Sequence, residues 1–162
     1  MPNDGETGWP HGDGSRKADE LVLSGSDDAE AVAKLADFLT RHSVKVVHTS
    51  ENAVMVEHHG RKFAMAPKLQ QDGLDRIVVH EYWAAKPDNP EMAFMRLVNQ
   101  LNNEYNTGAF YVDRDGDLGY QTQLTFMDRL TWEGVDAFLT WHDYTLFAVL
   151  FSHKEELQVY LR

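Results

Sequence analysis

Apolar residues recur at a helical spacing in three parts of the chain. The first is residues 24–43, where they fall three or four positions apart and so share one face of a helix. The second runs from 91 to 105, and the third begins at about residue 132. The expected N-caps are Ser26, Asn89 (followed by Pro90 in the first helical turn) and Thr131. The residues expected to face inward are Val32, Leu35, Ala36, Leu39, Phe94, Leu97, Val98, Leu101, Tyr105, Val135, Phe138, Leu139, His142, Leu146, Val149 and Leu150.

Between these helices the pattern alternates with a period of two, which is typical of half-buried strands. Short polar or glycine-containing turns separate the strands, and Pro67 is expected to end the third of them. The expected strands are residues 44–49, 53–58, 61–66, 76–84, 109–112 and 118–126. The last segment, residues 152–162, fits a continued helix, but its "LQVYL" fits a short strand equally well.

The "DRDGD" segment, residues 113–117, lies between two of these strands and has three possible interpretations. A calcium loop of the EF-hand type needs glycine at position 6 and an acid at position 12, but position 12 is Leu124 here. A catalytic carboxylate pair is disfavoured because acids on a tight turn stay hydrated. Asp115-Gly116 between alternating strands favours a hairpin turn, because glycine accepts a positive φ.

A run of strands, broken once by a helix and joined by short connections, predicts an α+β fold. We expect an antiparallel sheet of five or six strands with three helices packed on one face. Residues 1–20 are rich in Gly, Asp and Pro and are interpreted as a flexible N-terminal arm, in which Trp9 and His11 stand out. Residues 21–162 are expected to form a single domain.

Composition narrows the function classes. Of 162 residues, 43% are hydrophobic, which is sufficient for a core, and the absence of cysteine excludes thiolate sites and fits a cytoplasmic location. The formal net charge of −11 disfavours nucleic acid and anionic membrane surfaces, because both are bound through Lys and Arg. The apolar run 144–151 is far shorter than the roughly 20 residues of a membrane span.

Candidate site chemistry in the sequence is sparse. His58 and His59 are adjacent on an expected strand, so their side chains should point to opposite faces and not share an ion. No zinc-binding spacing of histidines occurs, and we expect no metal, no cofactor and no catalytic residue. His142, on an apolar helix face, fits a core or edge histidine. Asn102 fits a hydrogen bond to backbone near its helix end, although it could also line a ligand site.

The segment "LVNQLNNEYNTGAFYVDRDGDLGYQTQLTF" resembles the YbjN family of bacterial proteins, which are named as sensory transduction regulators. The match rests on Val98-Asn99 and Leu101-Asn102 in the helix and on the turn from Asp113 to Gly116, which contains Asp115. The resemblance implies a fold like that of type III secretion chaperones, which are small, acidic, cytoplasmic dimers that bind other proteins and lack catalytic activity. The resemblance does not identify a ligand-binding site in this chain.

From the resemblance we expect a non-enzymatic protein-binding module, chaperone-like or regulatory, that works as a homodimer and also binds an unidentified protein. The alternative is a small-molecule sensor with a pocket between helix and sheet, and an enzyme comes third. The last helix carries more aromatics than can face inward, so Trp141 and Tyr144 are expected at an interface. The resemblance adds pairing through the middle helix and neighbouring strands, with Met95 and Tyr111 as contacts.

Overall fold

The structure is a computed structural model, and it describes residues 19–70 and 74–162. Its centre is a six-stranded antiparallel sheet in the order β2-β3-β4-β5-β7-β6. The α+β class, the antiparallel sheet and all six expected strands are therefore confirmed. The bounds are β2 Lys45–Thr49, β3 Val54–His58, β4 Arg61–Lys68, β5 Asp75–Trp83, β6 Ala109–Val112 and β7 Leu118–Phe126.

A second sheet of two strands, which the sequence pattern did not predict, pairs β1 (Glu20–Val22) with β8 (Arg129–Thr131). Leu21 lies opposite Leu130, and both side chains are buried in the core. Asp19, whose carbonyl accepts a hydrogen bond from the Trp132 amide, and Glu20 therefore belong to the folded domain, two residues before the expected boundary. The expectation of a flexible arm otherwise concerns residues 1–18, including Trp9 and His11, which lie outside the described residues.

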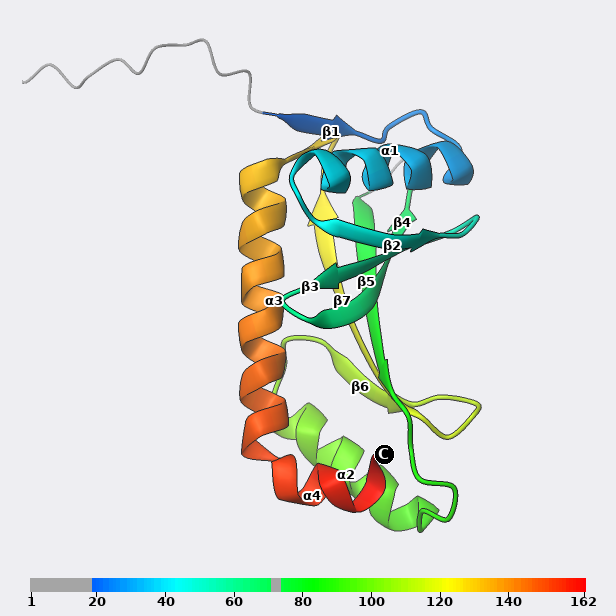
Figure 1. The fold of residues 1–162 in the computed structure, drawn as a ribbon, viewed down its shortest axis with the longest axis vertical. Coiled ribbons are helices and arrows are strands. Elements are labelled where there is room, and N and C mark those ends of the chain that lie inside the picture. Colours follow the sequence, from blue (N-terminus) through cyan, green and yellow to red (C-terminus); the bar gives the residue numbers. More distant parts are fainter. Residues whose placement is uncertain (1–18, 71–73) are drawn as a thin grey trace, which may run out of the picture.

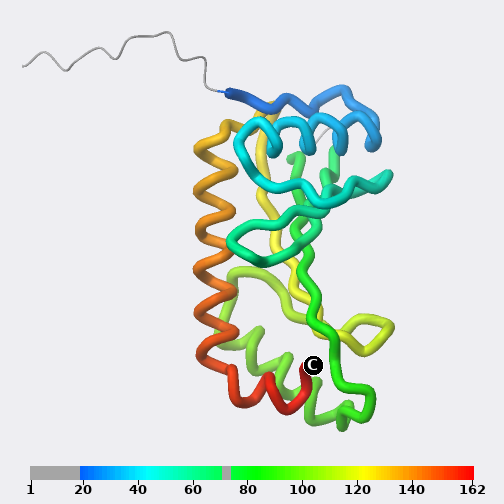
Figure 2. Tube along the Cα trace, in the orientation of Figure 1, coloured from blue at the N-terminus to red at the C-terminus, as the bar shows by residue number. Residues whose placement is uncertain are grey.

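Four helices cover one face of the six-stranded sheet: α1 (Asp28–Arg41), α2 (Glu91–Glu104), α3 (Trp132–Ser152) and α4 (Lys154–Tyr160). Figure 1 shows α3 running along the whole length of the molecule, with α1 beside one end of it and α2 and α4 beside the other. Three helices were expected. His153 interrupts the last one, and the short α4 follows before Leu161 bridges to Ala85. Figure 2 shows the C-terminus returning beside α2.

The core consists of two apolar clusters that α3 joins. One lies between α1, the first four strands of the sheet and the N-terminal half of α3, and it contains Phe38, Phe63 and Met65. The other lies between α2, β6, β7 and the C-terminal half of α3, and it contains Leu101, Phe110 and Leu146. The middle of α3 therefore lies between two separate hydrophobic cores.

Helix and strand ends differ from expectation at three places. Asp27, not Ser26, caps α1 by accepting a 2.8 Å hydrogen bond from the Glu30 amide. Pro90 occupies the N-cap position of α2, while Asn89 donates its side-chain amide to the Tyr160 carbonyl. Pro67 does not end β4, because β3 pairs with β4 only as far as Val54 opposite Met65, and proline is tolerated on the strand edge left unpaired beyond that point. Thr131 caps α3, as expected.

Candidate functional site

The outer side of α3 carries a row of exposed aromatic side chains, which we call the aromatic strip. Its members are Trp141, Tyr144, Phe147 and Phe151, which are 39%, 75%, 65% and 70% exposed. Their spacing of three, three and four residues places them within about a third of the helix circumference. The rings of Phe147 and Phe151 stack 5.8 Å apart. The strip is therefore a continuous apolar surface along the C-terminal half of α3.

The inner side of the same helix is also apolar, with Val135, Leu139, Leu146 and Val149 completely buried. A helix that is apolar all round is normally buried on every side. Full burial of an aromatic side chain covers about 150–250 Å², so the strip exposes roughly 500 Å². This is near the upper end of what soluble monomers leave uncovered, and such patches usually mark a binding surface.

The other two expected interface residues lie elsewhere. Met95 is an exposed residue of α2, whereas Tyr111 lies on the opposite face of the sheet, which no helix among the described residues covers. The Tyr111 hydroxyl donates a 2.9 Å hydrogen bond to the Tyr82 hydroxyl and lies 3.4 Å from His80 Nδ1. Burial, followed by the bond to Tyr82, raises the pKa of Tyr111. Burial also lowers the pKa of His80. Because Tyr111 lies on the face of the sheet away from the helices, Tyr111 and the aromatic strip of α3 cannot belong to one contact surface.

A cluster of charged residues lies under the middle of α3, between the two cores. Glu81 of β5 is only 5% exposed, and both its carboxylate oxygens accept hydrogen bonds from the guanidinium of Arg61 at the start of β4. His142 is completely buried, and its Nε2 lies 3.7 Å from Glu81 Oε2. The sequence pattern had not led us to expect the contact between Glu81 and His142. The alternation of Ile77, Val79 and Glu81 on one face of β5 is the signal that points the carboxylate inward.

Asp143 extends this cluster to the β3–β4 turn. The Nδ1 atoms of His58 and His59 lie 2.6 Å and 2.8 Å from the same oxygen, Asp143 Oδ2. The expectation that the two histidines point to opposite faces is therefore wrong. Strand alternation ends at His58, and His59 is a turn residue with φ 48°, so both rings can turn toward α3.

The residues of the family motif have different surroundings. Val98 is buried in the α2 face of the core, whereas Asn99 is exposed. Asn102 makes two 2.8 Å hydrogen bonds with the backbone of Phe110, donating to its carbonyl and accepting from its amide. Because β6 is an edge strand, the Asn102 amide satisfies backbone groups there that no further strand pairs. Asn102 thus ties α2 to the edge of the sheet.

The turn between β6 and β7 is a hairpin loop, as the sequence predicts. Asp113 Oδ1 accepts hydrogen bonds from the amides of Asp115 and Asp117, both at 2.9 Å, and Gly116 has φ 86°. Asp115 is exposed, and Asp117 accepts a 2.8 Å hydrogen bond from the Ala85 amide. Asp113 therefore closes the loop on itself, and Asp117 holds the loop against the end of β5.

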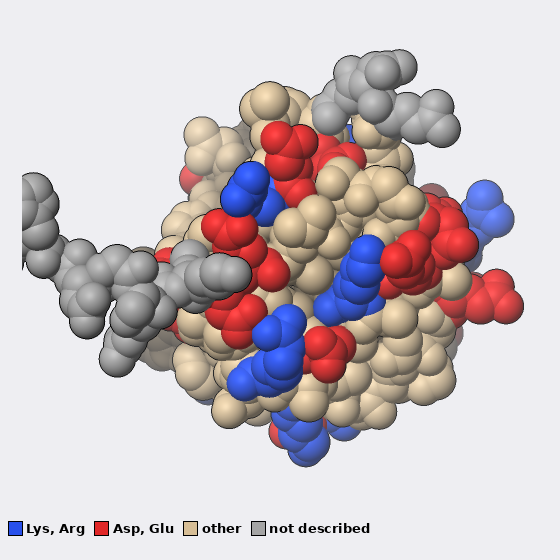
Figure 3. Space-filling view, turned by 90° about the horizontal axis from the view of Figure 1, so that it is seen from above, with Lys and Arg blue, Asp and Glu red and all other residues tan. Residues whose placement is uncertain are grey.

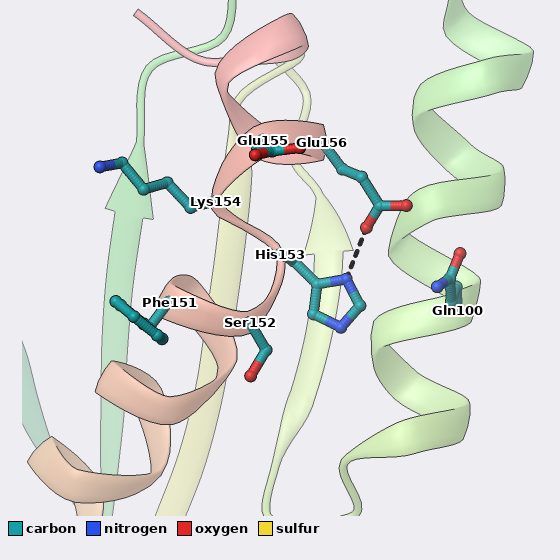
Figure 4. Close-up of a pocket in the computed structure, with 7 residues that line it drawn as sticks. All are labelled: Gln100, Phe151, Ser152, His153, Lys154, Glu155 and Glu156. Atoms are coloured by element: carbon teal, nitrogen blue, oxygen red, sulfur yellow. Dashed lines mark hydrogen bonds and ion pairs between the residues drawn. The ribbon is translucent and has the colours of Figure 1, made fainter.

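Figure 4 shows a hollow with a volume of about 700 Å³, where the α3–α4 junction faces Gln100 of α2. His153 lies at its base, with Nδ1 2.6 Å from Glu156 and Nε2 2.9 Å from Glu104. Burial lowers the pKa of His153, but these two carboxylates together raise it by more, so the net shift is upward. The hollow is open to solvent, and its imidazole is already paired with the carboxylates of Glu156 and Glu104.

The fold is that of an α+β protein whose features are an exposed aromatic strip and a buried charge cluster. A model of the YbjN family, described as "Putative bacterial sensory transduction regulator", matches residues 31–143. The chain therefore belongs to the YbjN family. A solved structure with the same fold is "Crystal structure of YbjN, a putative transcription regulator from E. coli", with a TM-score of 0.56 and 14% sequence identity. The alignment covers 80% of this chain and 94% of that one.

A comparison with curated proteins found no match. Among the described residues, none of the helices has the length and apolar character that crossing a membrane requires. The family description supports a regulatory role and names no ligand or catalytic step.

Proposed function

We propose that this protein is a non-enzymatic regulator that acts by binding protein, and that the aromatic strip of α3 is its binding surface. The observation that carries the proposal is the exposure of Tyr144, Phe147 and Phe151, each at least 65%, on a helix whose other side is fully buried. Aromatic residues are enriched in the centres of protein interfaces. The regulatory description of the family agrees with this role.

A second copy of the chain is the first occupant we propose for the strip. The exposed strip of roughly 500 Å² approaches the ~800 Å² that each partner buries in a standard interface. Two strips related by a twofold axis would place aromatic residues against aromatic residues, as a self-complementary contact requires. An unidentified protein partner would use the same surface or displace the second copy. A cytoplasmic location and the likeness to type III secretion chaperones are part of this proposal.

Charge supports a protein partner over nucleic acid. Figure 3 shows acidic and basic side chains interspersed on the end of the molecule above β1 and α1. Several are paired there, including Arg41 with Asp19 and Arg129 with Glu20. The overall charge of −11 repels phosphates. A small-molecule sensor has less support, because the hollow at the α3–α4 junction is open to solvent and its histidine, His153, is already paired with Glu156 and Glu104.

Light scattering after size exclusion tests the proposal, and we expect a mass of twice 18.5 kDa at tens of micromolar. The double variant Tyr144→Glu/Phe151→Glu should be monomeric, because carboxylates in a desolvated interface cost several kcal/mol each. Trp141 is a poorer choice because its ring also packs on Phe138. Met127→Glu, which changes a 71% exposed residue outside α3, is the matched control and should remain dimeric.

Met95→Glu distinguishes the alternative dimer through α2. If Met95→Glu is monomeric while the double variant stays dimeric, the dimer interface lies on α2 and not on α3. Three results together would refute the proposed function. Wild type would have the mass of one chain and would not bind an apolar dye. Pull-downs with the double variant would also recover every protein that wild type recovers.

A further inference from the structure

Three metal-ligating side chains meet where the β3–β4 turn touches the middle of α3. His58, His59 and Asp143 each offer one ligand atom, and these atoms all lie within 4.8 Å of one another. Both imidazole Nδ1 atoms approach one carboxylate oxygen, and the two ring centres are 4.1 Å apart. The donors therefore converge on one small volume instead of pointing to separate neighbours.

The fold holds these donors on rigid elements. His58 is the last residue of β3, and Asp143 lies in the middle of α3. His59 and Gly60 both have positive φ values, 48° and 79°, which turn the chain sharply and place the His59 ring beside that of His58. The donors come from parts of the chain more than 80 residues apart, so an ion bound there would clip the hairpin turn to the helix.

The surroundings orient the carboxylate. Arg61 Nη1 lies 3.6 Å from Asp143 Oδ1 and donates a 3.4 Å hydrogen bond to the Asp143 main-chain oxygen. Asp143 Oδ1 is buried and has no hydrogen-bond partner among the described residues. Oxygen Oδ2 thus faces the imidazoles, while Oδ1 remains a free acceptor on the same group. Hydrogen-bonded neighbours of this kind fix the orientation of metal ligands.

The local charge also suits a divalent cation. Glu81 and Asp143 carry two negative charges and Arg61 one positive charge, so the cluster has an excess negative charge when its histidines are neutral. In the ion-free form each Nδ1–H donates a hydrogen bond to the carboxylate, because a carboxylate can only accept. A bound metal would take the place of those shared protons.

We propose that His58, His59 and Asp143 form a reversible Zn²⁺ site. Two imidazoles and one carboxylate suit zinc, whereas calcium and magnesium require mostly oxygen ligands. Three protein ligands leave the fourth tetrahedral position for water, and His59, which is 72% exposed, places that position at the surface. Glu81 and His142 lie deeper in the cluster, and Glu81 pairs with Arg61, which in turn lies beside Asp143. The proposal does not depend on the aromatic strip.

The test uses the full-length chain, without a histidine tag, freed of metal with a chelator. Zn²⁺ is titrated in competition with a chromophoric chelator at neutral pH, and wild type should bind one ion. His59→Ala should weaken binding at least about tenfold, because a ligand contributes no less than an outer-shell partner. The matched control is His48→Ala, because His48 is an exposed histidine on β2, away from the cluster.

Asp143→Asn is the second variant, because it keeps the shape of the side chain and removes its charge. It should also weaken Zn²⁺ binding, with a circular dichroism spectrum like that of wild type. Co²⁺ should give wild type the absorption of a tetrahedral site, and both variants should lose it. The proposal is overturned if wild type binds no stoichiometric Zn²⁺, or if the His59 and His48 variants bind it equally well.

Discussion

The buried ion pair of Arg61 and Glu81 allows a quantitative stability prediction. Arg61→Met keeps the apolar stem of the side chain and removes the guanidinium that donates to both Glu81 oxygens. The carboxylate, 5% exposed, would then stay in the interior without its two hydrogen bonds. Breaking a buried pair from one side typically costs about 3–5 kcal/mol. Arg61 is itself 21% exposed, so we expect the lower end, about 3 kcal/mol.

Urea unfolding followed by circular dichroism measures this loss. For a urea m-value of roughly 1.5–2 kcal/mol/M, 3 kcal/mol lowers the midpoint by about 1.5–2 M. The double variant Arg61→Met/Glu81→Met should recover most of the loss, because a buried pair can often be replaced by apolar residues at little cost. Measurements in the presence of a chelator keep metal binding at His58 and His59 out of the comparison.

The matched control is Arg129→Met, which breaks the exposed pair with Glu20. Surface pairs contribute about 0–1 kcal/mol, so this variant should unfold close to wild type. Equal losses from the Arg61 and Arg129 variants would refute the reasoning, because Glu81 would then be solvated. A double variant less stable than either single one would show that packing, and not charge, dominates the site.

Three further predictions concern single residues. Gly119→Ala should destabilise by about 1–3 kcal/mol in urea, because a Cβ there runs into the Tyr111 ring, whereas Gly134→Ala, with its nearest contact 3.5 Å away, should not. Asn102→Ala should cost about 1–3 kcal/mol by leaving the Phe110 backbone groups unpaired, and amide exchange should speed up at Phe110. The pKa of His153 is raised in the folded protein, so its contribution to the free energy of unfolding is fully present below the unfolded pKa near 6.5 and is lost as pH rises through the folded pKa. Denaturation across pH 6–9 should show this loss in wild type, and His153→Gln should flatten it.

Much of the fold follows from local pattern. The hairpin formed by β6 and β7 is predictable because Asp115-Gly116 separates two clearly alternating strands. The inward face of α2 follows from the spacing of Phe94, Leu97 and Leu101, all of which are buried. Both signals lie within a few residues of the structure they predict, so long-range contacts have little chance to override them.

The missed elements depend on contacts between distant parts of the chain. The three residues of β1 form a strand only because β8, more than 100 residues later, lies beside them. The continuation of β4 through Pro67 depends on where its pairing with β3 stops, which the sequence around Pro67 does not reveal. Neither feature has a local signal strong enough to stand alone.

The candidate sites divide in the same way. The aromatic strip is predictable because it depends on the spacing of side chains along a single helix. The meeting of His58 and His59 at Asp143 requires both the positive φ at His59 and the packing of the turn on α3. If the alternation of β3 is assumed to continue to His59, the two rings are expected on opposite faces of the sheet, and the site is missed. Histidines at the ends of strands are therefore worth testing for metal binding, since the alternation rule no longer applies there.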